Sequence, residues 1–240
     1  MLDTVLFDLD GTLLPLDLEK FIQIYFTEMG RDFHDLITPE RLAKYIWAAT
    51  STMIKNVDER TNEAVFMESF GQLIGGDLSV YQQRFTEFYN GGFLKTRESV
   101  LESPQIREAV TLLKKKGYTL IIATNPLFPE QAIHHRIHWA GFEPAEFAYI
   151  TSYERNHYCK PQLLFYQEVL REINKRPEQC LMVGNDVQED LVALTTGMQT
   201  FLITDHLIHR TEDPIQTTYR GTYQTFLDFV KGLSPLCAAG

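Results

Sequence analysis

Two aspartates separated by a single residue follow the first apolar run of the chain, in the sequence VLFDLDGT. These residues are Asp8 and Asp10, and Gly11 comes directly after them, where a glycine allows the backbone to turn sharply. A carboxylate next to a buried run needs a positive partner, or it takes up a proton instead. The pair therefore either binds a cation or performs chemistry that depends on the closeness of two acids.

Polar residues stand at three later points of the chain. Thr124 and Asn125 come directly after the apolar run LIIA, and Lys160 precedes Pro161. The last group follows the apolar run LMVG and consists of Asn185, Asp186 and Asp190. In a parallel sheet the carboxyl ends of the strands meet at one edge, so we expect all these side chains to lie close together.

The expected cluster carries far more negative than positive charge. Two unit charges about 4 Å apart repel each other by about 4 kcal/mol at an effective dielectric constant of about 20. Lys160 alone does not balance four aspartates. A hard divalent cation does, and Mg²⁺ binds a few carboxylates together with water and phosphate oxygens. The sequence therefore predicts a Mg²⁺ site.

The same residues suit phosphoryl transfer. One carboxylate can attack phosphorus to form an aspartyl phosphate, and a second can protonate the leaving oxygen and later take a proton from water. Lys160, Thr124 and the backbone N–H groups of Leu9 and Asp10 supply donors for the phosphoryl oxygens. Asp8 and Asp10 point the same way on a strand, and the turn at Gly11 lets Asp10 reach the leaving group.

The elements that position these residues alternate between strand and helix. Strands are expected over residues 4–9, 119–124, 147–151, 181–183 and 200–203, and helices over 104–116, 130–139, 162–173, 189–196 and 223–230. Such alternation with right-handed crossovers predicts an α/β fold with a doubly wound, Rossmann-like parallel sheet.

The segment over residues 17–90 has a different pattern. Apolar residues such as Phe21, Ile24 and Tyr25 recur at helical spacing, and no strand pattern interrupts them. We therefore expect a four-helix insertion between Pro15 and the Gly91-Gly92 pair. Candidate substrate contacts in this insertion are Tyr25, Arg31, His34 and Trp47.

The four polar groups together resemble the motifs of the haloacid dehalogenase superfamily of hydrolases. DLDGT, from Asp8 to Thr12, is similar to its first motif, and Thr124, Lys160-Pro161 and GNDVQED are similar to the second, third and fourth. The resemblance implies that Asp8 is the nucleophile and that Asp10 is the general acid/base.

The resemblance also implies roles for the remaining motif residues. Mg²⁺ would be held by the side chain of Asp8, the backbone carbonyl of Asp10 and the side chain of Asp186. Lys160, Thr124 and the backbone N–H of Asn125 would hold the phosphoryl group. Asp190 would support either the metal site or Lys160.

The chain departs from the family pattern at one motif residue. Many members carry an acid directly after the fourth-motif glycine, where this chain has Asn185. Asp186 then takes the role of main ligand, and the alternative is that Asn185 is the ligand.

The insertion occupies the position of the family's helical cap. The resemblance thus implies an all-helical cap over residues 16–92, inserted into a Rossmann-like core of residues 1–15 and 93–240. Such a cap closes over the site, excludes water and selects the substrate.

These observations predict a Mg²⁺-dependent phosphatase that acts on a small phosphorylated metabolite through an aspartyl phosphate. Asp10 argues against a haloacid dehalogenase, which needs no acid at that position. A sugar phosphomutase and a catalytically inactive binding module stay open as alternatives. Phosphonate hydrolysis would need a lysine from the cap, and Lys20 and Lys55 have no special context there.

The amino-acid composition limits which partners and which cellular location we expect. With 32 acidic and 22 basic residues the net charge is −10, which argues against sequence-independent nucleic-acid binding. Three widely spaced cysteines, Cys159, Cys180 and Cys237, favour no disulfide framework and fit a reducing cytoplasm. We expect no signal peptide, and no apolar run approaches the ~20 residues of a membrane span. Either a monomer or a homodimer is expected.

Overall fold

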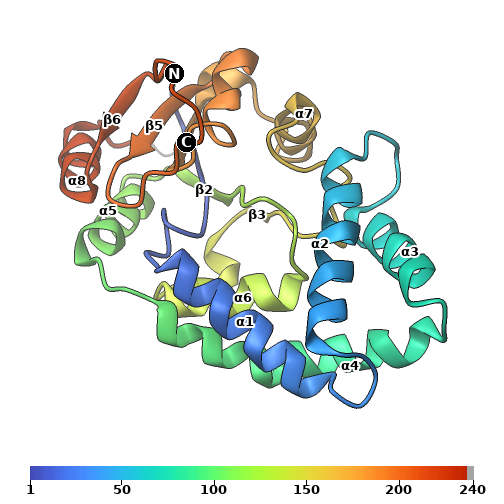
Figure 1. Cartoon of the computed structure of the whole chain (residues 1–240). Coiled ribbons are helices and arrows are strands. Elements are labelled where there is room, and N and C mark those ends of the chain that lie inside the picture. The colour runs from blue at the N-terminus through green and yellow to red at the C-terminus, as the bar shows by residue number, and fades with distance from the viewer. Residues whose placement is uncertain (237–240) are drawn as a thin grey trace.

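A parallel sheet of six strands is the frame of the molecule (Figure 1), and the structure, a computed structural model, describes residues 1–236. Cys237 lies outside the described residues. The strand order is β3-β2-β1-β4-β5-β6. The strands are β1 (Thr4–Phe7), β2 (Thr119–Ile122), β3 (Tyr149–Ile150), β4 (Cys180–Gly184), β5 (Gln199–Ile203) and β6 (Tyr219–Gly221). The order reverses between β1 and β4, where a crevice opens at the carboxyl ends of the strands.

The central strands are apolar on both faces because helices cover both faces of the sheet. Val5 and Phe7 of β1 face one apolar core, and Leu6 between them faces a second. The second core contains Phe165 and Tyr166 of α7, whereas α5 and α8 contribute to the first. The predicted doubly wound α/β sheet is therefore confirmed.

The helices that belong to this sheet follow its strands in sequence. They are α5 (Pro104–Lys115), α6 (Glu130–Trp139), α7 (Leu163–Glu172) and α8 (Tyr223–Gly232), with the short 3₁₀ helices η2 (Pro144–Glu146), η3 (Pro177–Gln179) and η4 (Leu191–Thr196).

Four further helices lie between β1 and α5, to one side of the sheet (Figure 1). They are α1 (Leu18–Asp32), α2 (Pro39–Lys55), α3 (Asn62–Ile74) and α4 (Leu78–Asn90), and the 3₁₀ helix η1 (Gly92–Ser99) follows them. Side-chain caps fix three starts: the side chains of Asp17, Thr61 and Asp77 accept backbone N–H groups. Four helices were expected here, while the division into a core (1–15 and 93–240) and a cap (16–92) stays a prediction.

Several element predictions differ from the structure. The strand expected over residues 147–151 has only two paired residues, because β3 is an edge strand. The helix expected over 189–196 is the shorter 3₁₀ helix η4, because the carboxylate of Asp186 accepts the N–H groups of Gln188 and Glu189 and holds a turn there. Neither η1 nor β6 was predicted, and β6 is a short, mostly exposed edge strand with little apolar pattern.

Candidate active site

The chain turns sharply after β1, and this turn places the first two acids. Gly11 has a φ of 78°, in the left-handed region that favours glycine. A Cβ at this position would lie 2.5 Å from Nδ2 of Asn185. The Gly11 carbonyl also accepts a hydrogen bond of 2.9 Å from the hydroxyl of Tyr223. The expected turn at Gly11 is thus present, and only glycine fits it.

The ammonium group of Lys160 is fully buried between two carboxylates. Its Nζ donates to Oδ1 of Asp8 at 3.0 Å and to Oδ1 of Asp190 at 2.6 Å. Burial by itself lowers the pKa of Lys160, but Asp190 and Asp8 raise it well above its usual value. Lys160 therefore stays charged next to the predicted nucleophile.

The side chain of Asp190 joins Lys160 to the loop after β4. Its second oxygen, Oδ2, accepts the backbone N–H of Asp186 at 2.9 Å. This close approach needs a glycine at the end of β4, because a Cβ on Gly184 would lie 2.1 Å from Oδ2 of Asp190. Of the two roles considered for Asp190, the structure shows contact with Lys160.

The carboxylate of Asp186 is strongly held. Oδ1 accepts the backbone N–H groups of Gln188 and Glu189, each at 3.0 Å. Arg210 faces the same carboxylate with both terminal nitrogens, at 2.7 Å from Oδ1 and 2.6 Å from Oδ2. A cation bound by Asp186 would therefore share this carboxylate with Arg210, a residue that the motifs did not indicate.

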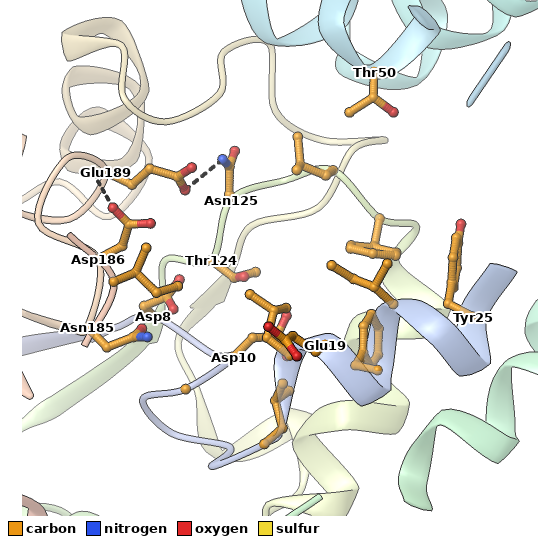
Figure 2. Close-up of a pocket in the computed structure, with 18 of the residues that line it drawn as sticks. Asp8, Asp10, Glu19, Tyr25, Thr50, Thr124, Asn125, Asn185, Asp186 and Glu189 are labelled. Carbon is orange, nitrogen blue, oxygen red and sulfur yellow. Dashed lines mark hydrogen bonds between the residues drawn. The ribbon is translucent and has the colours of Figure 1, made fainter. Parts of the chain in front are cut away.

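Asn185 lies beside Asp8 at the same edge of the sheet (Figure 2). Its Oδ1 accepts the hydroxyl of Thr12 at 3.0 Å, and its Nδ2 donates to the backbone carbonyl of His206 at 2.7 Å. Asn185 and Asp186 both line the pocket. The choice between them as the fourth-motif ligand thus stays open.

The second and third motifs are tied to each other. Thr124 lines the same pocket as Asp8 and Asp10 (Figure 2). The side chain of Asn125 accepts the backbone N–H of Lys160 at 3.2 Å and donates to Oε2 of Glu189 at 2.9 Å. Asn125 therefore holds the loop that carries Lys160.

A buried arginine that the motifs did not indicate pairs with Asp10. Arg136 of α6 is 1% exposed and donates from Nη1 to Oδ2 of Asp10. Its guanidinium lies 4.4 Å from the ring centre of Phe128, and its Nη2 has no hydrogen-bond partner among residues 1–236. In the sequence, Arg136 could have been recognised as buried because it lies one turn after Ala132 and on the same helix face as Ile133 and Ile137.

Burial raises the pKa of both predicted catalytic acids. For Asp10, the positive charge of Arg136 opposes this effect, and the pKa stays raised overall. Burial raises the pKa of Asp8 to about 8, since the repulsion from Asp190 and Asp10 adds to it while Lys160 opposes it. Asp8 thus needs further positive charge to stay ionised at neutral pH.

Metal binding by side chains alone is not evident. In residues 1–236, no three His, Cys, Asp or Glu side chains lie close enough together to bind an ion. The predicted ligand set includes a backbone carbonyl, that of Asp10, so it needs fewer side chains. The raised pKa of Asp8 and the surrounding carboxylates fit a cation at this point.

A pocket of about 710 Å³ opens above these residues. Figure 2 shows Asp8, Asp186 and Glu189 on one side of it, and Tyr25 and Thr50 on the other. Of the four candidate substrate contacts, Tyr25 and Trp47 line this pocket. Arg31 and His34 line a separate, smaller depression instead.

Comparison with known proteins gives relatives along most of the chain. A model of the haloacid dehalogenase-like hydrolase family matches residues 2–195. The chain is 25% identical to a glyceraldehyde 3-phosphate phosphatase of Methanothermobacter thermautotrophicus, over 98% of this chain and 100% of that protein. It is 23% identical to the pyrophosphatase PpaX of Bacillus cereus, over 83% of this chain and 82% of the relative.

Solved structures share the fold at lower identity. A HAD phosphatase from Thermococcus onnurineus aligns with a TM-score of 0.61 and 17% identity, over 98% of this chain and 100% of the other. A 2-haloacid dehalogenase from Pseudomonas syringae aligns with a TM-score of 0.64 and 21% identity, over 96% and 98%. Phosphatases and dehalogenases thus have this fold in common.

Proposed function

The chain belongs to the haloacid dehalogenase-like hydrolases, and from this premise we propose that it is a Mg²⁺-dependent phosphatase that hydrolyses a small phosphate monoester through an aspartyl phosphate on Asp8. The observation that most supports this proposal is the buried ammonium group of Lys160, whose Nζ lies 3.0 Å from Oδ1 of Asp8. Asp10 nearby accepts a hydrogen bond from Arg136. The nucleophile and the acid then have separate positive partners.

In the first step, a carboxylate oxygen of Asp8 attacks phosphorus and the bond from phosphorus to the ester oxygen breaks. The proton of Asp10 goes to the departing oxygen, which leaves as an alcohol. The raised pKa of Asp10 suits this role because it favours the protonated form of the carboxyl group.

In the second step, water attacks the phosphorus of the aspartyl phosphate. Asp10, now ionised, takes a proton from that water, and the bond from phosphorus to Asp8 breaks. Inorganic phosphate leaves, and both side chains return to their starting protonation states.

The phosphoryl oxygens need donors throughout. Lys160, the hydroxyl of Thr124 and the backbone N–H groups of Leu9, Asp10 and Asn125 are the proposed donors. Asp190 and Asn125 act on Lys160, because both contact it directly.

We assign the metal site to the side chain of Asp8, the backbone carbonyl of Asp10 and the side chain of Asp186, with Asn185 as the alternative to Asp186. Mg²⁺ bound there supplies positive charge to the phosphoryl group during transfer. The raised pKa of Asp8, which a nearby cation would oppose, supports this assignment.

Two alternatives make different predictions. A sugar phosphomutase would return an isomeric sugar phosphate in place of free phosphate. An inactive binding module would release no phosphate, and its biological role would survive the change Asp8→Asn. The fully formed Lys160–Asp8–Asp190 cluster supports an active enzyme.

A screen of small phosphate monoesters with Mg²⁺, scored by phosphate release, tests the proposal. We expect turnover of some esters by the natural protein and none by Asp8→Asn. Release of phosphate at equal rates by both proteins would contradict it.

No helix within residues 1–236 is long and apolar enough to cross a bilayer. The cytoplasmic location and the oligomeric state, monomer or homodimer, stay predictions.

A further inference from the structure

The pocket above the acids has one wall that the proposed chemistry does not use. We call this the helix wall. It consists of side chains from α1, α2 and α3, namely Phe21, Ile22, Tyr25, Phe26, Trp47 and Phe66. The rings of Phe21, Tyr25, Phe26 and Trp47 pack against one another in consecutive pairs at ring-centre distances of 5.2 to 6.1 Å. The surface that faces the leaving group is therefore aromatic and aliphatic.

The charges that line the pocket are distributed unequally. In the described part of the chain, the basic side chains that line the pocket are His206 and Arg210, both from the loop between β5 and β6, and Arg210 is paired with Asp186. The four-helix segment contributes only acidic charge to the pocket, from Asp17 at the N-cap of α1 and Glu19 in its first turn. An anionic leaving group on the helix wall would thus meet carboxylates and apolar surface, without a basic side chain of this segment to balance its charge.

Apart from Asp17 and Glu19, the polar groups of the four-helix side are hydroxyls that carry no charge. The phenol oxygens of Tyr25 and Tyr89 bond to each other at 3.0 Å. One of the two hydroxyl hydrogens fills this bond, which leaves a single O–H donor for a ligand. Thr50 adds a further hydroxyl at the pocket, on the side opposite the acids (Figure 2).

The pocket is also large for a three-carbon leaving group. Its volume of about 710 Å³ lies within the roughly 300–1,000 Å³ that hold organic ligands of considerable size. A small polar leaving group would leave most of the helix wall in contact with water, whereas an apolar one would displace that water.

Granted the proposed phosphatase activity, on which this inference rests, we propose that the substrate is the monophosphate ester of an uncharged, largely apolar alcohol whose carbon skeleton lies on the helix wall. Pyrophosphate, the substrate in the name of one relative, would place its second phosphoryl group against that wall. The geometry disfavours diphosphates and phosphate esters whose alcohol carries a carboxylate.

Straight-chain alkyl phosphates from ethyl to octyl provide the test. Their leaving oxygens are chemically alike, so chain length changes contact with the pocket and hardly changes reactivity. We expect kcat/KM for phosphate release to rise by about fourfold for each methylene buried. Pyrophosphate and 3-phosphoglycerate should be hydrolysed more slowly than octyl phosphate. A rate that is flat or falls with chain length, or a preference for pyrophosphate, would overturn the inference.

A matched pair of variants locates the effect. Ile22 and Leu73 are each 37% exposed on helices of the same segment, but only Ile22 lines the pocket. Ile22→Ala should lower kcat/KM for octyl phosphate severalfold and leave ethyl phosphate unchanged, while Leu73→Ala should change neither. Equal effects of both variants would contradict contact between the alkyl chain and the helix wall.

Binding separates this inference from the proposed activity. Alkylphosphonates have no ester bond to break, so calorimetry with the natural protein and Mg²⁺ measures the pocket without turnover. Affinity that rises from ethyl- to octylphosphonate supports the apolar pocket even when no ester is hydrolysed, and then only the proposed activity fails. Affinity independent of chain length overturns the apolar pocket whether or not phosphate is released from esters.

Discussion

The two sides of the pocket are built by different means. On the side of the strand ends, charged side chains are held by direct polar contacts, as in the contacts of Lys160 with Asp8 and Asp190. Gly11 and Gly184 lie so close to polar side chains that no Cβ fits. On the helix wall, Ile22 and Trp47 are partly exposed and are held by apolar packing. Reaction chemistry requires fixed charges, whereas an apolar wall requires only shape and volume.

The comparison explains how one fold serves several activities. Dehalogenases and phosphatases align with this chain to similar extents, so the fold alone does not identify the reaction. We therefore expect the residues at the strand ends to set the reaction and the helices beside them to set the substrate. Changes on the first side should therefore abolish turnover, and changes on the second should shift preference.

The largest effect is expected at Asp8. Asp8→Asn removes the nucleophile but keeps its shape, so kcat should fall on the order of 10⁴-fold or more. Steady-state phosphate release measures this change. Asp228→Asn, at an exposed position of α8, is the control and should keep full activity. Turnover by Asp8→Asn near the natural rate would refute the assignment.

Metal removal should come next. Exhaustive treatment with EDTA should reduce activity on the order of 10³-fold, because the carboxylates around Asp8 then repel the phosphoryl group. Added Mg²⁺ should restore the activity.

Two variants then distinguish the ligands. Whichever of Asp186→Asn and Asn185→Ala weakens Mg²⁺ binding more in a metal titration identifies the fourth-motif ligand. Undiminished activity after EDTA would contradict the metal requirement.

Arg136 offers a smaller effect on the same side. Arg136→Met should lower kcat on the order of 10²-fold because Asp10 loses its fixed orientation. Loss of the buried hydrogen bond from Arg136 to Asp10 should also cost about 2 kcal/mol in the free energy of unfolding. Arg136→Lys should rescue part of kcat, a result that a purely structural role does not predict. The control is Arg171→Met, at an exposed position; if kcat is unchanged in Arg136→Met, orientation of Asp10 by Arg136 is refuted.

Stability should depend on pH through Asp8. Its pKa rises from 3.8 to about 8 on folding, so the folded state binds the proton more tightly than the unfolded state. The metal-free protein should therefore be most stable below pH 4 with respect to this group and lose that contribution as pH rises toward 8. Thermal melts should show this loss for the natural protein and a flatter profile for Asp8→Asn. Parallel profiles for the two proteins would exclude Asp8 as the cause.

The smallest effect is expected on the helix wall. Trp47 is 55% exposed, and its ring packs against that of Phe26 at a ring-centre distance of 5.7 Å. Trp47→Ala should raise KM for apolar esters about threefold, because part of the apolar contact is lost, and leave kcat unchanged. Initial-rate kinetics separate the two constants. A fall in kcat comparable to that of Arg136→Met would remove the distinction between the two sides.

The sequence predicts the motif side of this comparison well for a physical reason. Asp8, Thr124 and Asn185 directly follow apolar runs, and parallel strands bring their carboxyl ends to one edge. Arg136 and Arg210 could not be placed this way. Arg136 reaches Asp10 across the fold from a helix face, and Arg210 belongs to an irregular loop without periodicity.

On the side of the helix wall, the sequence predicted four helices but not which of their residues line the pocket. Apolar spacing indicated the helices, but a helix presents several faces, and the packing between helices decides which one meets the pocket. Tyr25 and Trp47 line the pocket, while Arg31 and His34 from the same set of candidates do not. Tertiary packing, which local pattern does not encode, made this difference.

Direct detection of the phosphorylated aspartate tests the central claim most directly. Asp10→Asn should form the intermediate from an ester whose leaving group needs no acid, and should hydrolyse it slowly because the base is missing. Acid quenching, digestion and mass spectrometry then locate the label. The account predicts one phosphoryl group on the peptide that contains Asp8. Phosphate release with this peptide never labelled, or with the label on another residue, would contradict it.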